Sequence, residues 1–373
     1  AYEMSASLVG SGDVYKRQAY FLGKKELFQG LAMETLEKDW TVYPVLHFDF
    51  SVSKYITADM LSAVINRQLL LWEKIYQREE GETTFSLRFE GIIRRAYKQT
   101  GKQVVVLIDE YDSPMLDSNH NDEVQKEIRN IMRDFFSPLK AQGQYLRFLL
   151  LTGISKFSQM SIFSELNNLQ NISMRDDYSA ICGITEQELR TQLQIDIEQM
   201  AQANKETYEE ACVHLKQQYD GYHFTWPSPD VFNPFSLLNA FEDGKLNSYW
   251  FGSGTPTYLI EMLRKFHVLP SEVGHSMQAM AASFDAPTER MTTITPLLYQ
   301  SGYVTIKDYD KYTELYTLDI PNREIRVGLM QSLLPNYLAY NTDMGLTTIG
   351  RMYGAIRLGD MDGALRLLQE FLS

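Results

Sequence analysis

This sequence of 373 residues has little of what marks several common protein classes. It has 2 cysteines, Cys182 and Cys212, which are too few for a disulfide framework or a four-thiolate metal site and favour a reducing compartment. Its 12 prolines and its 44% of hydrophobic residues exclude a collagen or a solvated linker. No run approaches the roughly 20 apolar residues that a membrane-spanning helix needs. We therefore expect a folded, soluble, cytoplasmic protein with no membrane partner.

Positive charge is also scarce. The 35 lysines and arginines face 48 aspartates and glutamates, so the net charge of −13 gives no global attraction to nucleic acid. The 6 histidines show no H-x-x-x-H or H-E-x-x-H spacing, and we expect no zinc site. His223 could form an acid/base pair with Asp220, although a packed structural role among the neighbouring aromatic residues is the preferred interpretation.

The first eighteen residues, AYEMSASLVGSGDVYKRQ, show no signal-peptide pattern and no clear period. Residues 13–18 are what the DNA string GATGTGTATAAGAGACAG encodes, and this string resembles a transposon end used to build sequencing libraries. We interpret residues 1–18 as a sequencing-adapter artefact and leave them out of the predicted fold. A natural N-terminal tail is the alternative.

From residue 19 onward, short apolar runs alternate with amphipathic stretches. This pattern is typical of an α/β fold in which helices cover a parallel sheet. The expected strands are 43–50, 104–108 and 146–151, and the expected helices lie around 61–75, 89–96 and 121–140. The run at 104–108 is apolar throughout, as in a central strand that is buried on both faces.

Polar residues follow two of these strands. Asp109 and Glu110 come directly after one, and the segment from Thr152 to Lys156 follows the other. Ligands of open α/β sheets bind at the carboxyl edge of the strands, so both endings indicate one site. In P-loop nucleotidases, the strand-end aspartate holds Mg²⁺ and a following glutamate can orient the attacking water. A plain surface turn is equally compatible with these residue types.

Three segments carry a family resemblance. VVVLIDEYDSPM (104–115), LLLTGISKFSQMSIFSELNNLQNIS (149–173) and YDGYHF (219–224) resemble the bacterial AAA-ATPase-like family, whose members often carry a C-terminal PD-(D/E)XK nuclease domain. The similarity runs from about Lys24 to Phe371. It implies a P-loop NTPase (RecA/AAA-like) fold with ATP and Mg²⁺ as cofactors.

The resemblance also implies roles for individual residues. Asp109 matches the metal-holding aspartate of the Walker B strand, and Glu110 matches the catalytic glutamate. Thr152 or Lys156 matches the nucleotide-sensing position that contacts the γ-phosphate.

One required motif is absent from the sequence. A phosphate loop needs G-x-x-x-x-G-K-[S/T], and the nearest approaches, at 23–25 and 101–103, lack this spacing. We therefore expect a core (19–235) that has lost its first strand and phosphate loop, and a chain that is inactive although its full-length parent is an ATPase. The loss should expose the edges of the strands at 104–108 and 146–151 and cause aggregation.

A proline-rich loop around 227–234 separates the core from a mostly helical region (236–373). Helices near 255–266 and 276–283, followed by a hairpin whose turn lies at 308–311, predict a winged-helix-like region. Residues 285–340 hold five basic and seven acidic side chains, which favours a lid or packing module over a DNA contact. No convincing nuclease motif follows residue 240, so a nuclease domain is expected beyond residue 373.

Three functions follow from these observations. The first is a fragment of an AAA-like ATPase hydrolase whose partner is a nucleotide. The second is a naturally non-catalytic P-loop-like regulatory or interaction protein. The third is the ATPase arm of a DNA-acting nuclease system, which rests on the resemblance alone.

Overall fold

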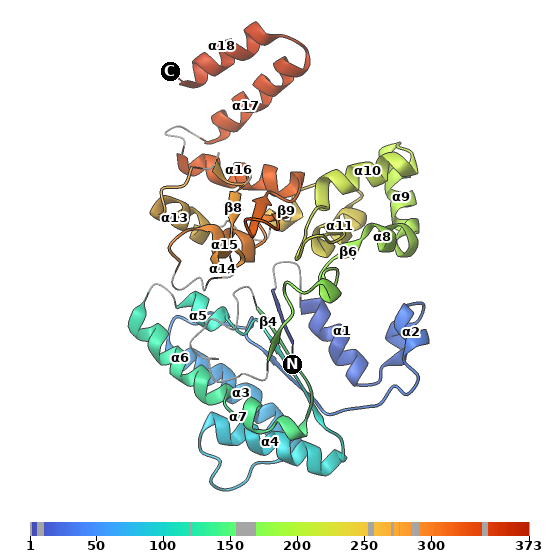
Figure 1. Cartoon of the computed structure of the whole chain (residues 1–373), viewed down its shortest axis with the longest axis vertical. Coiled ribbons are helices and arrows are strands. Elements are labelled where there is room, and N and C mark those ends of the chain that lie inside the picture. The colour runs from blue at the N-terminus through green and yellow to red at the C-terminus, as the bar shows by residue number, and fades with distance from the viewer. Residues whose placement is uncertain are drawn as a thin grey trace.

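The computed structural model describes residues 2–5, 11–118, 121–153, 169–252, 257–269, 272–275, 277–284, 286, 291–337 and 342–372. A lobe built on a parallel sheet lies below a second lobe of helices and a small sheet, and a helical hairpin extends beyond the second lobe (Figure 1). Within these residues, no helix is both long enough and apolar enough to cross a membrane.

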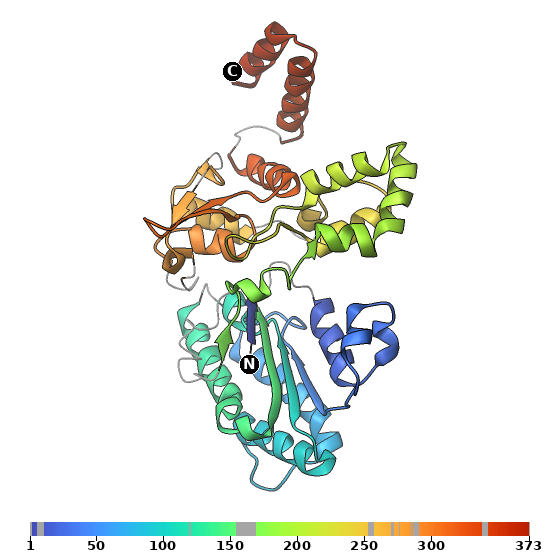
Figure 2. The same ribbon diagram turned by 45° about the vertical axis from the view of Figure 1, so that its right-hand side comes forward.

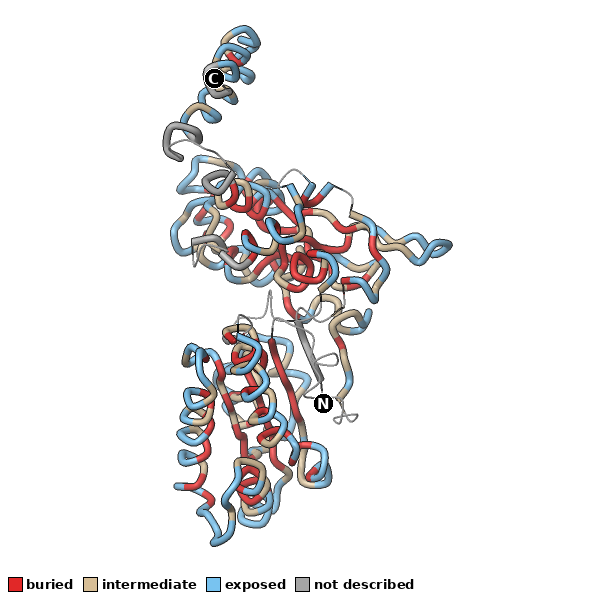
Figure 3. The backbone as a smooth tube through the Cα atoms, turned by 90° about the vertical axis from the view of Figure 1, so that its left-hand side faces the viewer, coloured by how far each residue is buried: buried red, intermediate tan, exposed pale blue. Residues whose placement is uncertain are grey.

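Five parallel strands form the main sheet, in the order β2-β3-β4-β1-β5. Their bounds are β1 (Tyr2–Ser5), β2 (Val45–Asp49), β3 (Val104–Asp109), β4 (Leu146–Gly153) and β5 (Gln170–Asn171). Every residue of β3 is buried, which confirms the prediction of a central strand. Figure 3 shows buried residues along the strands and exposed residues on the outer sides of the helices.

Alternation along β3 assigns its side chains to two cores, because successive residues of a strand point to opposite faces. Val104, Val106 and Ile108 join the cluster that lies under α3 (Ala58–Tyr76), α4 (Phe85–Thr100), α6 (Asp122–Phe136) and α7 (Pro138–Ala141). Val105 and Leu107 join the cluster that contains Val14 and Phe21 of α1 (Ser11–Phe21). Figure 2 shows the two helical layers on opposite sides of the sheet.

Local sequence signals explain where the first of these helices begin and end. Thr57, Thr84 and Asn121 cap α3, α4 and α6 by accepting hydrogen bonds from backbone N–H groups of the first turn. Gly101 ends α4 in a left-handed conformation, as its lack of a Cβ allows. The single helix predicted over 121–140 is instead two helices, because Pro138 opens a new one after Ser137.

The structure corrects the prediction of a missing first strand. Residues 2–5 form β1, which pairs with β4 on one side and with β5 on the other. β3 lies between β2 and β4, and β1 covers the outer edge of β4, so neither predicted strand has an exposed edge in the described part of the sheet. Residues 1–18, left out of the predicted fold, thus contribute β1 and most of α1 to the first lobe.

The second lobe begins with a helical unit that also has a two-stranded sheet. Its elements are β6 (Ile184–Thr185), α8 (Glu186–Gln192), α9 (Gln194–Asn204), α10 (Tyr208–Tyr219), β7 (Val231–Phe232), α11 (Pro234–Asp243) and α12 (Tyr249–Gly252). Leu189, Leu215, Leu237 and Ala240 share one buried cluster. Packing therefore continues across residue 235, where the sequence suggested a domain boundary.

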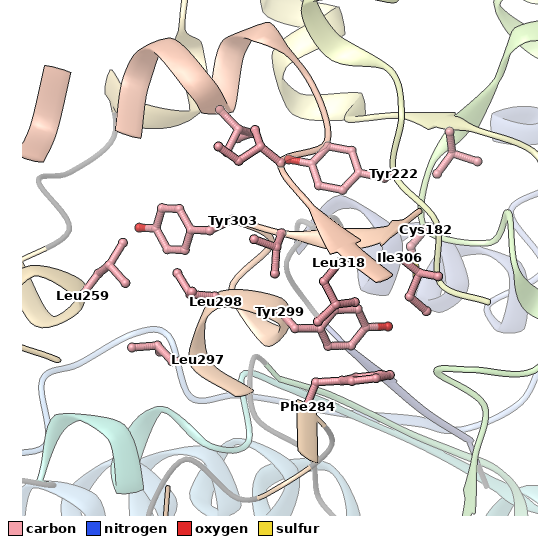
Figure 4. Close-up of a cluster of buried hydrophobic side chains, with 14 of the residues drawn as sticks. Cys182, Tyr222, Leu259, Phe284, Leu297, Leu298, Tyr299, Tyr303, Ile306 and Leu318 are labelled. Carbon is pink, nitrogen blue, oxygen red and sulfur yellow. The ribbon is translucent and has the colours of Figure 1, made fainter. Parts of the chain in front are cut away.

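The rest of this lobe surrounds a three-stranded antiparallel sheet in the order β8-β10-β9. Its buried side chains converge in the cluster of Figure 4. The elements are α13 (Thr257–Lys265), β8 (Met277–Ala279), α14 (Ala281–Phe284), α15 (Thr295–Gln300), β9 (Thr305–Asp310), β10 (Leu315–Asp319) and α16 (Arg323–Tyr337), followed by the hairpin of α17 (Thr342–Arg357) and α18 (Met361–Leu372).

Two predictions for this region need correction. The helix expected at 276–283 starts as β8, because residues 277–279 pair with β10. The hairpin is confirmed, but residues 308 and 310 lie within β9 and the turn follows at 311–314.

Deleting residues 1–10 should make the protein aggregate, because it removes β1 and leaves the apolar strand β4 with an unpaired edge. Light scattering and size-exclusion chromatography of the full chain and of the deletion variant measure this effect. A monomeric deletion variant with a sharp thermal transition would show that β1 does not protect the sheet.

Candidate functional site

Three strands of the parallel sheet end in polar side chains at one edge. Asp49 is the last residue of β2, and Asp109 is the last residue of β3. Glu110 follows directly after β3, and Thr152 is the next-to-last residue of β4. The register pairs Asp49 with Asp109 and places Met4 of β1 beside Thr152. The candidate site is this edge, which faces the second lobe in Figure 1.

Strand alternation places the key side chains on the same face of the sheet. Asp109 follows Leu107 by two residues and Thr152 follows Leu150 by two, and both leucines belong to the cluster on the α1 side. Helix α1 begins six residues after the end of β1, so its N-terminus lies near the same edge of the sheet.

A short hydrogen bond joins the ends of β3 and β4. The Thr152 hydroxyl donates to Oδ1 of Asp109 at 2.5 Å, and both side chains are buried. The backbone N–H of Glu110 lies 3.1 Å from the same oxygen. The two residues predicted to hold the metal and to contact the nucleotide are therefore in direct contact.

Burial dominates the electrostatics of Asp109. It raises the pKa of this carboxyl, and the nearby Asp49 carboxylate raises it further, while the bond from Thr152 lowers it. A donated hydrogen bond favours the ionised form of a carboxyl, so Thr152 keeps Asp109 closer to the charged state that a metal ligand requires.

Glu110 leaves the strand in an unusual backbone conformation. Its φ of +47° lies in the left-handed region, which few residues other than glycine adopt and which often marks functional sites. The turn directs its carboxylate to Ser113, whose hydroxyl donates a hydrogen bond at 2.9 Å. Burial raises the pKa of Glu110, with smaller effects from the neighbouring acids.

The site also contains residues that the sequence interpretation missed. Asp49 is a third polar strand ending and could have been found by the reasoning applied to Asp109. His47 lies two residues earlier on the same strand, its ring packs edge-on against Tyr15 of α1 at 5.4 Å, and burial lowers its pKa. An isolated histidine in an apolar strand gave no sequence signal for this position. Lys156, the other candidate for the nucleotide contact, lies outside the described residues.

The described residues at this edge include carboxylates of the kind that bind Mg²⁺, but no groups of the kind that bind a triphosphate. A nucleotide-bound Mg²⁺ needs only one or two protein carboxylates, which Asp109 and its neighbours supply. Across the described part of the chain, no three His, Cys, Asp or Glu side chains gather into a metal-binding group. The sequence has no phosphate loop, and α1 begins with Ser11, Gly12 and Asp13, where a phosphate-binding helix would carry a lysine.

Comparison with known proteins agrees with the architecture of this lobe. Residues 14–163 match the model of a family described as "Predicted AAA-ATPase". The matched AAA-ATPase-like segment includes Asp49, Asp109, Glu110 and Thr152. It ends before β5 and the second lobe.

A curated relative extends the likeness beyond this segment. The protein, named "Uncharacterized protein in vnfD 5'region", comes from Azotobacter chroococcum mcd 1 and is 32% identical over 361 residues. The match covers 95% of this chain and 66% of that protein. No solved structure matches this chain.

Replacing Thr152 with valine tests the bond to Asp109. We expect a loss of roughly 1.5–3 kcal/mol in unfolding free energy at pH 8, because an ionised buried carboxylate loses a donor. Without the donor, the pKa of Asp109 rises further, so the loss should shrink as the pH falls and Asp109 becomes protonated.

Urea denaturation at pH 5 and pH 8 measures the change, and Thr152→Ser, which keeps the hydroxyl, is the control. An equal loss for the valine variant at both pH values would mean that the hydroxyl does not serve the ionised form of Asp109.

Proposed function

We propose that the first lobe is the core of a nucleoside-triphosphatase in which the acidic half of the hydrolytic site is assembled. The observation that carries this proposal is the Asp109–Thr152 hydrogen bond at the ends of β3 and β4, with Glu110 next in the chain. The match of residues 14–163 to the AAA-ATPase-like family supports it.

Each residue has a specific task in this proposal. Asp109 would hold Mg²⁺ through its carboxylate, which Thr152 positions by donating a hydrogen bond to Oδ1. Glu110, with a pKa raised by burial, is suited to accept a proton from water, and Ser113 positions its carboxylate. Bound magnesium would supply charge stabilisation for phosphoryl transfer. Thr152 would contact the nucleotide.

This chain as it stands should not hydrolyse ATP. Phosphates are bound by backbone N–H groups and a lysine of a glycine-rich loop, and the sequence contains no such loop. We assign ATP hydrolysis to a parent that carries the loop, in the cytoplasm as the sequence suggests.

The second candidate is a non-catalytic regulatory or interaction protein that keeps the fold. The acidic residue at the start of α1 favours this candidate, because Asp13 would repel phosphate. The presence of both Asp109 and Glu110 favours the ATPase, since a non-catalytic protein gains nothing from keeping a buried and a half-buried acid at this edge.

A DNA-binding role for the second lobe receives less support. The order of α13, β8, α14, α15, β9 and β10 is compatible with a winged-helix-like unit, in which a helix such as α15 would enter the groove of DNA. Residues 296–300 of α15 are all buried, and this helix contributes Leu297 and Tyr299 to the cluster of Figure 4. We propose that this unit packs within the protein rather than binding DNA.

A gain-of-function variant tests the ATPase proposal. The substitutions Ser7→Gly, Asp13→Lys and Val14→Thr turn residues 7–14 into G-L-V-G-S-G-K-T, a complete phosphate-loop motif. We expect the unmodified chain to show no Mg-ATP binding and the triple variant to bind and slowly hydrolyse it. Isothermal titration calorimetry and phosphate release measure the two steps.

Two further variants serve as controls. Val14 is buried, so Val14→Thr alone carries the packing cost without the lysine. Adding Glu110→Gln to the triple variant should preserve binding and lower hydrolysis by at least about 100-fold. A folded triple variant that binds no nucleotide would favour the non-catalytic candidate.

A further inference from the structure

The YDGYHF segment, residues 219–224, has no role in the proposed function, although it is almost entirely buried. It begins at the last residue of α10 in the helical unit and packs against β9 and the start of α16. The joint, as we call it, consists of residues 220–223, 305–307 and 321–322.

Side chains of the second lobe clamp the backbone of this segment. The Thr305 hydroxyl accepts a hydrogen bond from the His223 N–H at 2.8 Å and donates one to the His223 carbonyl at 2.8 Å. The Asn322 amide donates to the Asp220 carbonyl at 3.0 Å. These contacts link parts of the chain that are 82 and 102 residues apart.

Lys307 completes the clamp. Its ammonium group donates to the carbonyl of Gly221 at 2.6 Å and to that of Pro321 at 3.3 Å, so one side chain joins both partners. Gly221 has a φ of +96°, and a Cβ at this position would lie 2.4 Å from the Pro321 oxygen. Only glycine permits this approach.

The carboxylate of Asp220 contrasts with this well-bonded backbone. Asp220 is 2% exposed, and no side chain in the described part of the protein donates a hydrogen bond to it. Lys216 forms an ion pair with it at 3.8 Å, a separation too long for a hydrogen bond. The histidine considered above as its partner pairs elsewhere, since Nε2 of His223 lies 3.3 Å from Asp230.

Charged groups from several elements lie in and around the joint. Lys216 lies on α10 and is bonded to Glu186 of α8 at 2.8 Å, while Lys307 comes from β9. Asp230 precedes β7, and Asp319 ends β10. Burial lowers the pKa of Lys307, while the carboxylates of Asp230, Asp220 and Asp319 oppose this shift by smaller amounts. The joint therefore contains two lysines and several acids, of which Asp220 is the most deeply buried.

We infer that the joint is a proton-sensitive latch between the helical unit α8–α12 and the three-stranded unit β8–β10, in which Lys307 clamps the backbone and the buried Asp220 takes up the proton. With Asp220 protonated, the joint contains no buried carboxylate charge. With Asp220 ionised, the buried carboxylate has Lys216 at 3.8 Å but no side-chain hydrogen-bond donor among the described residues, and its poor solvation weakens the coupling. This inference does not depend on the proposed ATPase.

The sign of the effect follows from the pKa. Burial raises the pKa of Asp220 to about 6, above its value in an unfolded chain. The stability contributed by the protonated form is therefore present at low pH and lost as the pH rises through about 6. Burial lowers the pKa of His223, so the contribution of His223 has the opposite sign.

The variant Asp220→Asn separates the pH effect of Asp220 from that of His223, because it places an uncharged side chain at position 220. The quantity to compare is the unfolding equilibrium constant of the wild type divided by that of the variant. This ratio should be roughly 50-fold larger at pH 7.5 than at pH 4. Urea denaturation across this pH range gives the ratio. Asp308→Asn, which removes an exposed carboxylate beside Lys307, is the control and should change the ratio less than about twofold.

A second measurement tests the coupling itself. Lys307→Met should accelerate amide exchange in residues 219–224, 305–310 and 321–325 together at pH 7.5, while β3 and α4 stay protected. Lys311→Met, at the exposed hairpin turn, should leave exchange unchanged. Lys307→Arg keeps the charge and should preserve protection if the methionine variant is too unstable to measure.

Two results would overturn the latch. One is an equal pH dependence of stability in the wild type and Asp220→Asn. The other is faster exchange in only one of the two units when Lys307 is replaced by methionine.

Discussion

Strand β3 is the constraint on which the rest of the first lobe depends. All six of its residues are buried, so both faces of the sheet must be covered by helices. Side-chain alternation then sends Val104, Val106 and Ile108 to one core and Val105 and Leu107 to the other. The helices α3, α4 and α6 and the opposing α1 occupy the positions that this double burial requires.

The same strand positions the candidate site. Parallel strands end at a common edge, so the carboxylates of Asp49 and Asp109 and the hydroxyl of Thr152 meet there although they are far apart in sequence. Burial raises the pKa of Asp109, and the Thr152 bond opposes that effect. This balance is what the proposed magnesium site rests on, while the sequence contains no loop for the phosphates of a nucleotide.

The second lobe is held together in a different way. Its helical unit and its three-stranded unit meet at residues 220–223, where the backbone of one is clamped by side chains of the other. These contacts depend on the side chains of Thr305, Lys307 and Asn322. The close approach of the Pro321 carbonyl requires glycine at position 221. The cost of this packing is the burial of Asp220, which makes the joint sensitive to protons.

The sequence alone determined the elements with a strong periodic signal: β2, β3, β4, α3, α4, α6 and the β9–β10 hairpin. It also predicted that Asp109 and Glu110 lie at the carboxyl end of a buried strand, where the structure has them. Only the tertiary structure decided the place of β1, since a four-residue strand has no period of its own and is defined by the neighbours that pair with it. The same reason applies to β8, to Asp49 beside Asp109, and to His223, whose partner is Asp230 rather than Asp220. Burial and pairing depend on residues far along the chain, and local patterns do not record them.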